Sequence, residues 1–148
     1  MKIFALHIYF DKKPTIYEDG RQIRDYINYR DVVDANIMAL EDDRANYQCF
    51  NVGGGKDYAV MDFYERVQKV TGKRIKPVIS KYYRFGDTRH IFSDISRLKS
   101  LGWRPVISIE KSIDEYWEHL NSQTDIRNIL DYAEKTMMSK GVVRSIQK

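Results

Sequence analysis

One group of side chains with chemical potential is an arginine beside an acid and an aromatic residue. Residues 23–29 have the composition of an extended run, and they include Arg24, Asp25 and Tyr26. Successive side chains of a strand point to opposite faces, so Arg24 and Tyr26 would share one face while Asp25 takes the other. Spacing alone favours a structural ion pair beside a core tyrosine, because such groups more often support a fold than bind a ligand.

A second arginine and acid, Arg84 and Asp87, lie in a polar and aromatic-rich segment over residues 81–90, which predicts a loop. Taken by themselves, these two residues could form an exposed ion pair three positions apart. Such a pair would contribute little stability, since solvent screens it. Composition and spacing therefore leave the role of both arginines open.

Other reactive side chains do not form a recognisable site. Gly53-Gly54-Gly55 follows a predicted strand, as a dinucleotide-binding turn would, but Tyr58 stands where the third glycine of that fingerprint is required. We interpret this segment as a plain turn. His7, His90 and His119 are far apart and share no metal-ligand spacing with Cys49, so no metal site is predicted.

The elements around Arg24 determine where it lies. Residues 2–11 are densely apolar and predict a helix that ends before Pro14 and needs a buried neighbour. Residues 18–20 predict a tight turn in which Gly20 has a positive φ. Asp31 is the predicted N-cap of a following helix. The apolar positions of that helix are Val33, Ile37 and Leu40.

The rest of the chain alternates short strands and helices. The predicted elements are a strand over 47–52, a helix capped by Asp57 and ended by Gly72, a strand over 75–79, a helix over 93–100, a helix capped by Ser108 and a last helix capped by Thr124. The helix after Asp57 has the clearest periodicity. Its inward positions are Val60, Phe63, Tyr64, Val67 and Val70.

Length and composition indicate an ordinary folded domain. The chain has 148 residues and a formal net charge of +4, but its lysines and arginines are scattered among almost as many acids. This favours small anions over nucleic acid as partners. No apolar run approaches the roughly 18 residues that span a bilayer, so a membrane partner is not expected. We expect a cytoplasmic protein, because the single Cys49 cannot form an internal disulfide.

Four motifs occur in a specific order along the chain. They are Thr15-Ile16-Tyr17 with Gly20, Arg24-Asp25-Tyr26 and Asp31-Val32-Val33; Phe50 to Gly55; Arg84 to Arg89; and Asp94 to Arg97 leading into Leu101-Gly102-Trp103-Arg104-Pro105. Together they resemble the C-terminal, substrate-binding part of the extended short-chain dehydrogenase/reductase family, the nucleotide-sugar epimerases and dehydratases such as UDP-glucose 4-epimerase. The resemblance covers roughly Ile3 to Leu120. It implies a mixed α/β fold, the small substrate-binding lobe without most of the Rossmann half.

The resemblance also implies roles for individual residues. Arg24 and Arg84 match arginines that contact the diphosphate of a nucleotide-sugar, and Asp87 matches an acid near the ribose or beside that clamp. Tyr17, with the backbone of Thr15 and Ile16, matches the place of the base. Tyr26 belongs to the same substrate-binding motif as Arg24. A guanidinium suits a diphosphate because its planar fork of donors stays charged at any working pH.

In the family, catalysis needs NAD, a Gly-rich turn and a catalytic Tyr-x-x-x-Lys pair. Tyr9 and Lys13 have that spacing, but they lie too close to Arg24 in the sequence, and Pro14 prevents one rigid helix. We therefore expect that this chain alone binds no NAD and is inactive, with a separate cofactor-binding chain as a possible partner.

Two further expectations concern organisation. Residues 1–122 form the substrate-binding region and residues 123–148 a C-terminal helix and tail of unknown role. Residues 3–10 should expose apolar surface and promote self-association. The alternative to a nucleotide-sugar-binding domain is a non-catalytic assembly module derived from it. An RNA-binding role has only the basic pI and the tyrosine content in its support.

Overall fold

The structure is a computed structural model that describes residues 1–146. Its elements are α1 (Lys2–Tyr9), β1 (Thr15–Tyr17), β2 (Ile23–Asp25), α2 (Tyr29–Glu41), the short 3-10 helix η1 (Asp43–Ala45), β3 (Asp57–Ala59), α3 (Val60–Thr71), β4 (Val78–Ser80), β5 (Tyr82–Arg84), α4 (Ser96–Ser100), α5 (Ile109–Ser122), α6 (Leu130–Ser139) and β6 (Val143–Ser145). β1 pairs with β4 in parallel, whereas β2–β3 and β5–β6 are antiparallel. The mixed α/β class is confirmed.

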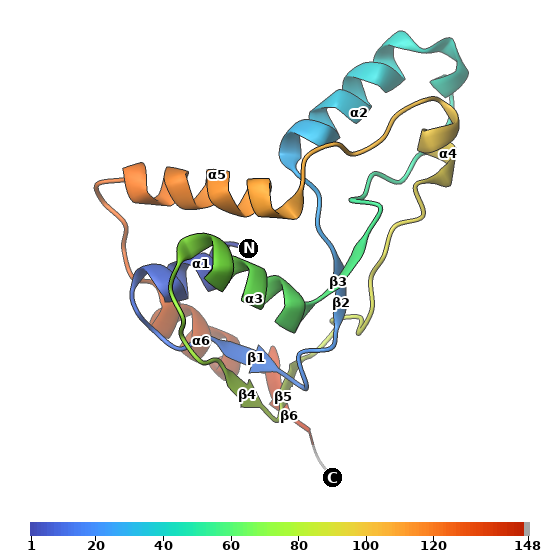
Figure 1. Ribbon diagram of the computed structural model, residues 1–148. Helices are drawn as coiled ribbons and strands as arrows, with labels where there is room; N and C mark the ends of the chain where they lie inside the picture. The colour runs from blue at the N-terminus through green and yellow to red at the C-terminus, as the bar shows by residue number, and fades with distance from the viewer. Residues whose placement is uncertain (147–148) are drawn as a thin grey trace.

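These elements form a body and an arm (Figure 1). The body contains α1, α3, α5 and α6 with the β1–β4 and β5–β6 sheets, and the arm carries α2 and α4. The β2–β3 ladder connects the two parts. Within residues 1–146, none of the helices combines the length and the apolar character that crossing a membrane would require.

α3 lies at the centre of the body, as its periodicity predicts. Phe63, Tyr64 and Val67 are fully buried, and Gly72 ends the helix in the left-handed conformation with φ 71°. The prediction that Asp57 caps this helix is wrong. Asp57 pairs with Asp25 in the β2–β3 ladder, so the backbone stays extended through Ala59, which is the actual N-cap.

α1 is helical as predicted, and its apolar face is covered. Ala5, Leu6 and Ile8 are buried against residues of α3, α5 and α6. Most of the apolar surface expected at residues 3–10 is therefore inside the body, although Ile3 is exposed. The exposed apolar face lies on α2 instead, where Val33, Ile37 and Leu40 are 50%, 47% and 87% exposed.

The start of α2 also differs from the prediction. Asn28, not Asp31, is the N-cap, and its side chain accepts a hydrogen bond from the backbone N–H of Arg30. Asp31 lies in the first turn and is only 1% exposed. Its carboxylate accepts hydrogen bonds from the backbone N–H groups of Val106 and Ile107 at 3.1 and 3.2 Å, which attaches the helix to the loop before α5.

The predicted strand over 47–52 is wrong as well. In the described structure these residues do not pair with any strand. Phe50 and Val52 pack against the arm's own cluster, which centres on Leu98 and Trp103. The apolar composition of residues 47–52 therefore reflects packing of their side chains, not backbone pairing in a sheet.

The C-terminal third agrees with the prediction in part. Ser108 caps α5 by accepting a hydrogen bond from the N–H of Lys111. Thr124 does not cap α6, which begins at Leu130 after Ile129. The segment predicted as a loop over 81–90 contains β5, which pairs with β6 near the end of the chain. The tail thereby acquires a structural role that the sequence did not indicate.

The buried hydroxyl of Tyr64 gives a testable prediction for the core. It donates a 2.7 Å hydrogen bond to the carbonyl oxygen of Ile75, and burial raises the pKa of Tyr64 from 10.0 to about 12. Between these values the unfolded chain loses the proton first, so stability should fall as the pH rises from 10.0 to about 12. Tyr64→Phe should reduce this decline and, at neutral pH, cost about 1 kcal/mol of unfolding free energy.

Urea titrations across this pH range would measure both effects, with the exposed Tyr132→Phe as the control. An unchanged pH profile in Tyr64→Phe would contradict the assignment of this decline to Tyr64.

Candidate functional site

A cavity of about 430 Å³ opens between α1, β1, β5 and α6. Seven residues singled out from the sequence all line it: Thr15, Ile16, Tyr17, Arg24, Tyr26, Arg84 and Asp87. They come from three separate strands and the loops that follow them, so only the fold brings them together. Their role in binding a substrate stays a prediction, and the geometry below defines what the cavity can do.

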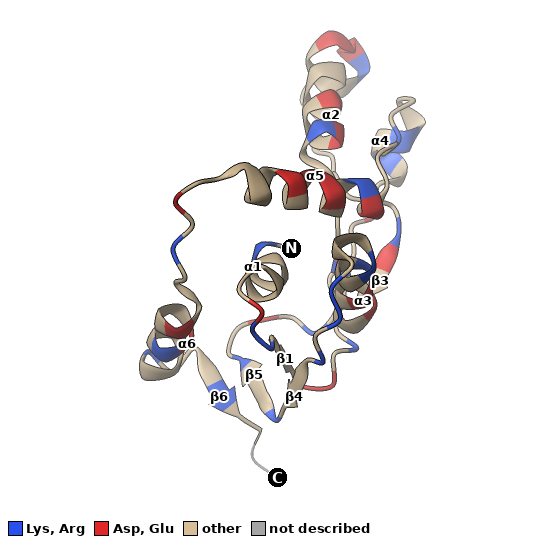
Figure 2. Ribbon diagram, turned by 60° about the vertical axis from the view of Figure 1, so that its left-hand side comes forward, with Lys and Arg blue, Asp and Glu red and all other residues tan. Residues whose placement is uncertain are grey.

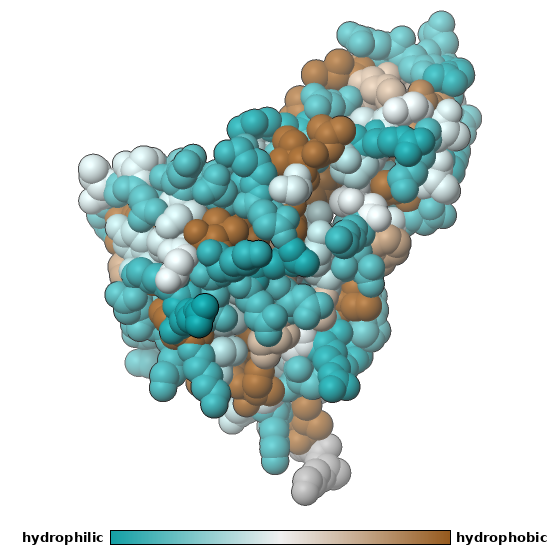
Figure 3. Space-filling view, in the orientation of Figure 1, coloured by the Kyte–Doolittle hydropathy of each residue, from teal (hydrophilic) through white to brown (hydrophobic). Residues whose placement is uncertain are grey.

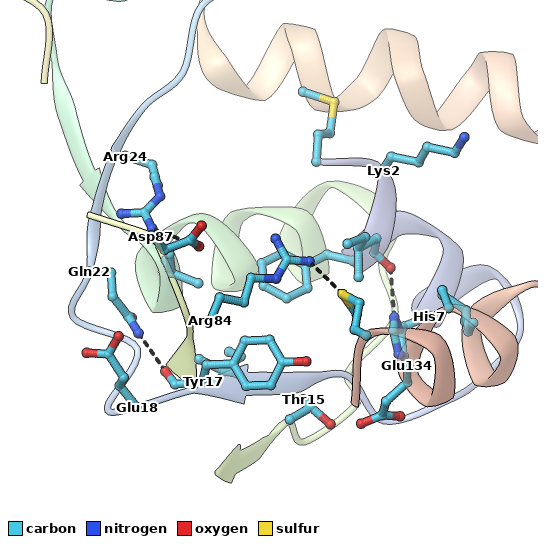
Figure 4. A pocket seen from close by; sticks show the side chains of 18 of the residues that line it. Lys2, His7, Thr15, Tyr17, Glu18, Gln22, Arg24, Arg84, Asp87 and Glu134 are labelled. Atoms are coloured by element: carbon cyan, nitrogen blue, oxygen red, sulfur yellow. Dashed lines mark hydrogen bonds and ion pairs between the residues drawn. The ribbon is translucent and has the colours of Figure 1, made fainter. Parts of the chain in front are cut away.

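Arg24 and Asp87 lie together at one end of the cavity (Figure 4). The Arg24 Nη2 atom is 3.6 Å from the Asp87 Oδ2 atom, and Nη1 donates to the carbonyl oxygens of Ile23 and Arg89, each at 2.9 Å. The pair considered from spacing, Arg84 with Asp87, is not the one that forms. Asp87 holds the other arginine in place and leaves Arg84 free for other contacts.

Arg84 extends from β5 into the middle of the cavity (Figure 4). Its Nη2 atom lies 3.4 Å from the sulfur of Met137, a weak acceptor, and its buried Nε–H has no acceptor among residues 1–146. An unpaired buried donor costs free energy, and an anion would satisfy it with a charge-assisted hydrogen bond. Arg84 is therefore poised for a negatively charged ligand.

Tyr17, the last residue of β1, lies beside Arg84 in the cavity. Burial raises the pKa of the Tyr17 hydroxyl; the positive charge of Arg84 opposes this rise, and the negative charge of Glu134 adds to it. Gln22 donates a 2.7 Å hydrogen bond to the Tyr17 carbonyl oxygen and so holds this end of the strand. The phenol ring is a neutral, flat surface against which a base could stack.

Three other predicted residues contribute through packing. Ile16 is 1% exposed and belongs to the core, so only its backbone is available to a ligand. Thr15 precedes it in the β1–β4 ladder. The Tyr26 ring stacks on Phe63 with centroids 4.0 Å apart, and burial raises the pKa of Tyr26 to about 12. Tyr26 is thus a neutral wall behind Arg24.

Several lining residues were missed from the sequence. They are Lys2, His7, Gln22, Glu134 and Met137, among others. Ile3 and His7 recur at helical spacing on α1, which could have indicated a shared face. The residues of α6 lie outside the motifs of the resemblance, so no signal pointed to them.

Two sequence patterns that resemble a dinucleotide-binding turn and a catalytic Tyr-x-x-x-Lys pair have structural explanations. A Cβ on Gly53 would lie 2.2 Å from the Asp25 Oδ2 atom, and one on Gly54 would lie 2.1 Å from the Tyr26 carbonyl oxygen. These glycines permit close packing on β2, and the Gly54 N–H donates to Asp25. α1 ends at Tyr9 and Asp11 has a positive φ, so Lys13 does not continue the helix. Residues 1–146 contain no cluster of three potential metal ligands.

The fold is a mixed α/β lobe with two arginines in one cavity. Comparison with known proteins identifies its family. The chain is 31% identical to a putative UDP-glucose 4-epimerase of Methanocaldococcus jannaschii, over 84% of this chain and 40% of that protein. It superposes on the Thermotoga maritima UDP-glucose 4-epimerase solved with UDP-glucose, with a TM-score of 0.74 and 31% identity over 80% of this chain and 38% of that one.

A UDP-N-acetylglucosamine 4-epimerase from Methanobrevibacter ruminantium, solved with UDP-N-acetylmuramic acid, gives a TM-score of 0.75 at 30% identity. It matches 82% of this chain and 39% of its own. The family model described as GDP-mannose 4,6 dehydratase matches residues 2–116. The chain belongs to this family, the NAD-dependent epimerases and dehydratases of the extended short-chain dehydrogenase/reductases. It spans about two fifths of the length of the relatives it matches.

Proposed function

We propose that this chain binds a nucleoside-diphosphate sugar and forms the substrate-binding part of an NAD-dependent epimerase or dehydratase. The observation that carries the proposal is the position of Arg84 in the cavity. Its guanidinium faces the same space as Arg24 and has an unpaired buried donor. Two arginines from different strands would hold a diphosphate while leaving the sugar free to turn.

Charge distribution supports a small anion rather than a polynucleotide. Lysines and arginines are interspersed with acids along the helices, and within residues 1–146 they do not form a continuous basic stripe (Figure 2). Several arginines already face carboxylates, including Arg24 with Asp87 and Arg89 with Asp19. Recognition of a nucleic-acid backbone would call for a basic surface instead.

The proposal includes the absence of NAD binding and turnover by the chain alone. The sequence of 148 residues holds no complete dinucleotide fingerprint, and Tyr9 and Lys13 do not line the cavity. A cofactor-binding polypeptide would supply NAD, the hydride acceptor of the family, and the groups that move the proton. The residues described here would hold and orient the nucleotide part of the substrate.

Calorimetric titration of the purified chain tests this function. UDP, dTDP or GDP should bind with a Kd in the millimolar to high-micromolar range, which corresponds to about −4 to −6 kcal/mol. NAD should produce no heat of binding. Copurification of NAD, or turnover of a nucleotide-sugar that is lost in Tyr9→Phe, would contradict the proposal that the chain is inactive alone. Failure of all three nucleotides at millimolar concentration would reject the substrate site.

A second candidate function, assembly, is favoured by the exposed apolar face of α2. Val33, Ile37 and Leu40 lie about one turn apart on a helix that projects from the body, and hydrophobic surface is visible along it (Figure 3). Exposed apolar surface of this kind is typical of a contact between proteins. We propose that this face mediates self-association, or covers a cofactor-binding partner when one is present.

Light scattering coupled to gel filtration measures this association. The wild-type chain should form a dimer or larger assembly, and Ile37→Asp should shift it to a monomer because a charge in an apolar contact is costly. Tyr47→Asp, a similar change at an exposed position outside the face, is the matched control. A wild-type chain that stays monomeric at high concentration would rule out self-association.

A further inference from the structure

The cavity has a wall that the motifs of the nucleotide-sugar family do not include. Leu130, Ala133, Glu134 and Met137 of α6 all line it, at the spacing i, i+3, i+4 and i+7 that places them on one face of the helix. α6 follows residue 116, where the family match ends. This wall therefore belongs to a part of the chain for which that match predicts nothing.

α6 is held firmly against the site. Leu130 packs in a cluster with Ala5 and Leu6 of α1. β6, directly after α6, pairs with β5 so that Val143 lies opposite Arg84. The side chains of α6 are thus fixed relative to the arginine that would hold a phosphate.

Glu134 has no hydrogen-bonding partner among the residues that the structure describes. Figure 4 places it with His7 and Thr15 at one end of the cavity, whereas Arg24 and Asp87 lie at the other. The His7 Nδ1 atom is 2.8 Å from the Ile3 carbonyl oxygen, so Nδ1 must donate the proton. In the neutral ring the other nitrogen is then an acceptor. The end of the cavity remote from Arg24 therefore carries an unpaired carboxylate, that of Glu134, and Lys2 also lines the cavity on this side.

The unpaired carboxylate of Glu134 favours a ligand that presents hydrogen-bond donors. A carboxylate accepts two parallel N–H bonds, as it does from an arginine fork. Guanine offers two adjacent donors on one edge, N1–H and the 2-amino group. Uracil and thymine offer one N–H between two carbonyl oxygens. When that N–H donates to the carboxylate, the carbonyl oxygens lie near its negative charge and are repelled. Adenine and cytosine place an acceptor beside their amino group.

We propose that Glu134 reads the base of the bound nucleotide and selects guanine, with the base against Tyr17 and the diphosphate at Arg84 and Arg24. This inference rests on the proposed function and names its substrate class as guanosine-diphosphate sugars. The solved relatives described above were determined with uridine nucleotides, so the preference would be a property of this chain's α6.

Titration of wild type and Glu134→Gln with GDP, IDP, UDP and xanthosine diphosphate tests the proposal. Wild type should bind GDP at least about tenfold more tightly than UDP and IDP, since IDP lacks the 2-amino donor. Glu134→Gln should lose about tenfold or more for GDP and gain affinity for xanthosine diphosphate, because its amide N–H can donate to the 2-carbonyl oxygen. A misfolded or merely loosened protein would not gain a ligand in this way.

Asp131→Asn is the matched control, an acid-to-amide change one turn away on α6 and outside the cavity lining. It should leave every affinity within about threefold, as expected for its exposed ion pair with Lys12. Equal binding of GDP and UDP by wild type, or an unchanged preference in Glu134→Gln, would overturn base selection while the diphosphate site stands. Failure of wild type to bind any nucleoside diphosphate would overturn both.

Discussion

Replacing Arg84 with alanine is expected to weaken the binding of a nucleoside diphosphate by about 1.5–3 kcal/mol, the range of a charge-assisted contact. The guanidinium faces the cavity and has no carboxylate partner in residues 1–146, so its charge is available to the ligand. Arg84→Lys should recover only part of the loss, because an ammonium group cannot form the planar fork. Calorimetric titration of the three proteins with the same nucleotide measures these differences.

Arg24→Ala should weaken binding by a similar amount, but it also removes the partner of Asp87 and two hydrogen bonds to backbone carbonyls. Its melting temperature must therefore be measured alongside its affinity. Arg144→Ala, on the strand next to Arg84 and outside the cavity lining, is the matched control. If this control, or a pair of surface Lys→Ala changes, loses as much affinity as Arg84→Ala, binding is due to general positive charge and the site assignment fails.

Asp31→Asn is expected to lower the free energy of unfolding by about 2–4 kcal/mol. The carboxylate is buried and accepts two backbone hydrogen bonds, from Val106 and Ile107, each in the range of about 1.5–3 kcal/mol for a charged acceptor. The asparagine amide would place a donor against one of those N–H groups. The midpoint of urea unfolding, with its slope, measures the loss.

Asp34→Asn is the matched control, because Asp34 is an exposed acid on the same helix. It should change stability by no more than about 0.5 kcal/mol. Equal stability of the two variants would show that the hydrogen bonds to the loop do not hold α2 in place.

Sequence patterns predicted the body better than the arm. The periodicity of α3 identified its buried face because that helix is surrounded by other parts of the same chain. The same kind of pattern on α2 identified an apolar face, at Val33 and Ile37, that residues 1–146 leave about half exposed. Periodicity reports that a face is apolar, whereas burial depends on which neighbours are present.

Capping was harder to predict, because a short polar side chain near a helix start has several possible partners. Asp31 suits an N-cap, yet Asn28 takes that place and Asp31 instead binds a loop more than 70 residues away in the sequence. The site shows the same limit. The resemblance grouped Arg24, Arg84 and Asp87, but which arginine Asp87 would face, and the presence of Glu134, depended on long-range packing.

The pairing of β5 with β6 has a consequence for the order in which the site can form during synthesis. Arg84 lies opposite Val143, so this pairing cannot form until residue 143 has been synthesised. In any shorter nascent chain, Arg84 lacks its antiparallel neighbour. A premature stop before Val143 would spare every residue of the family motifs and still leave Arg84 without that neighbouring strand.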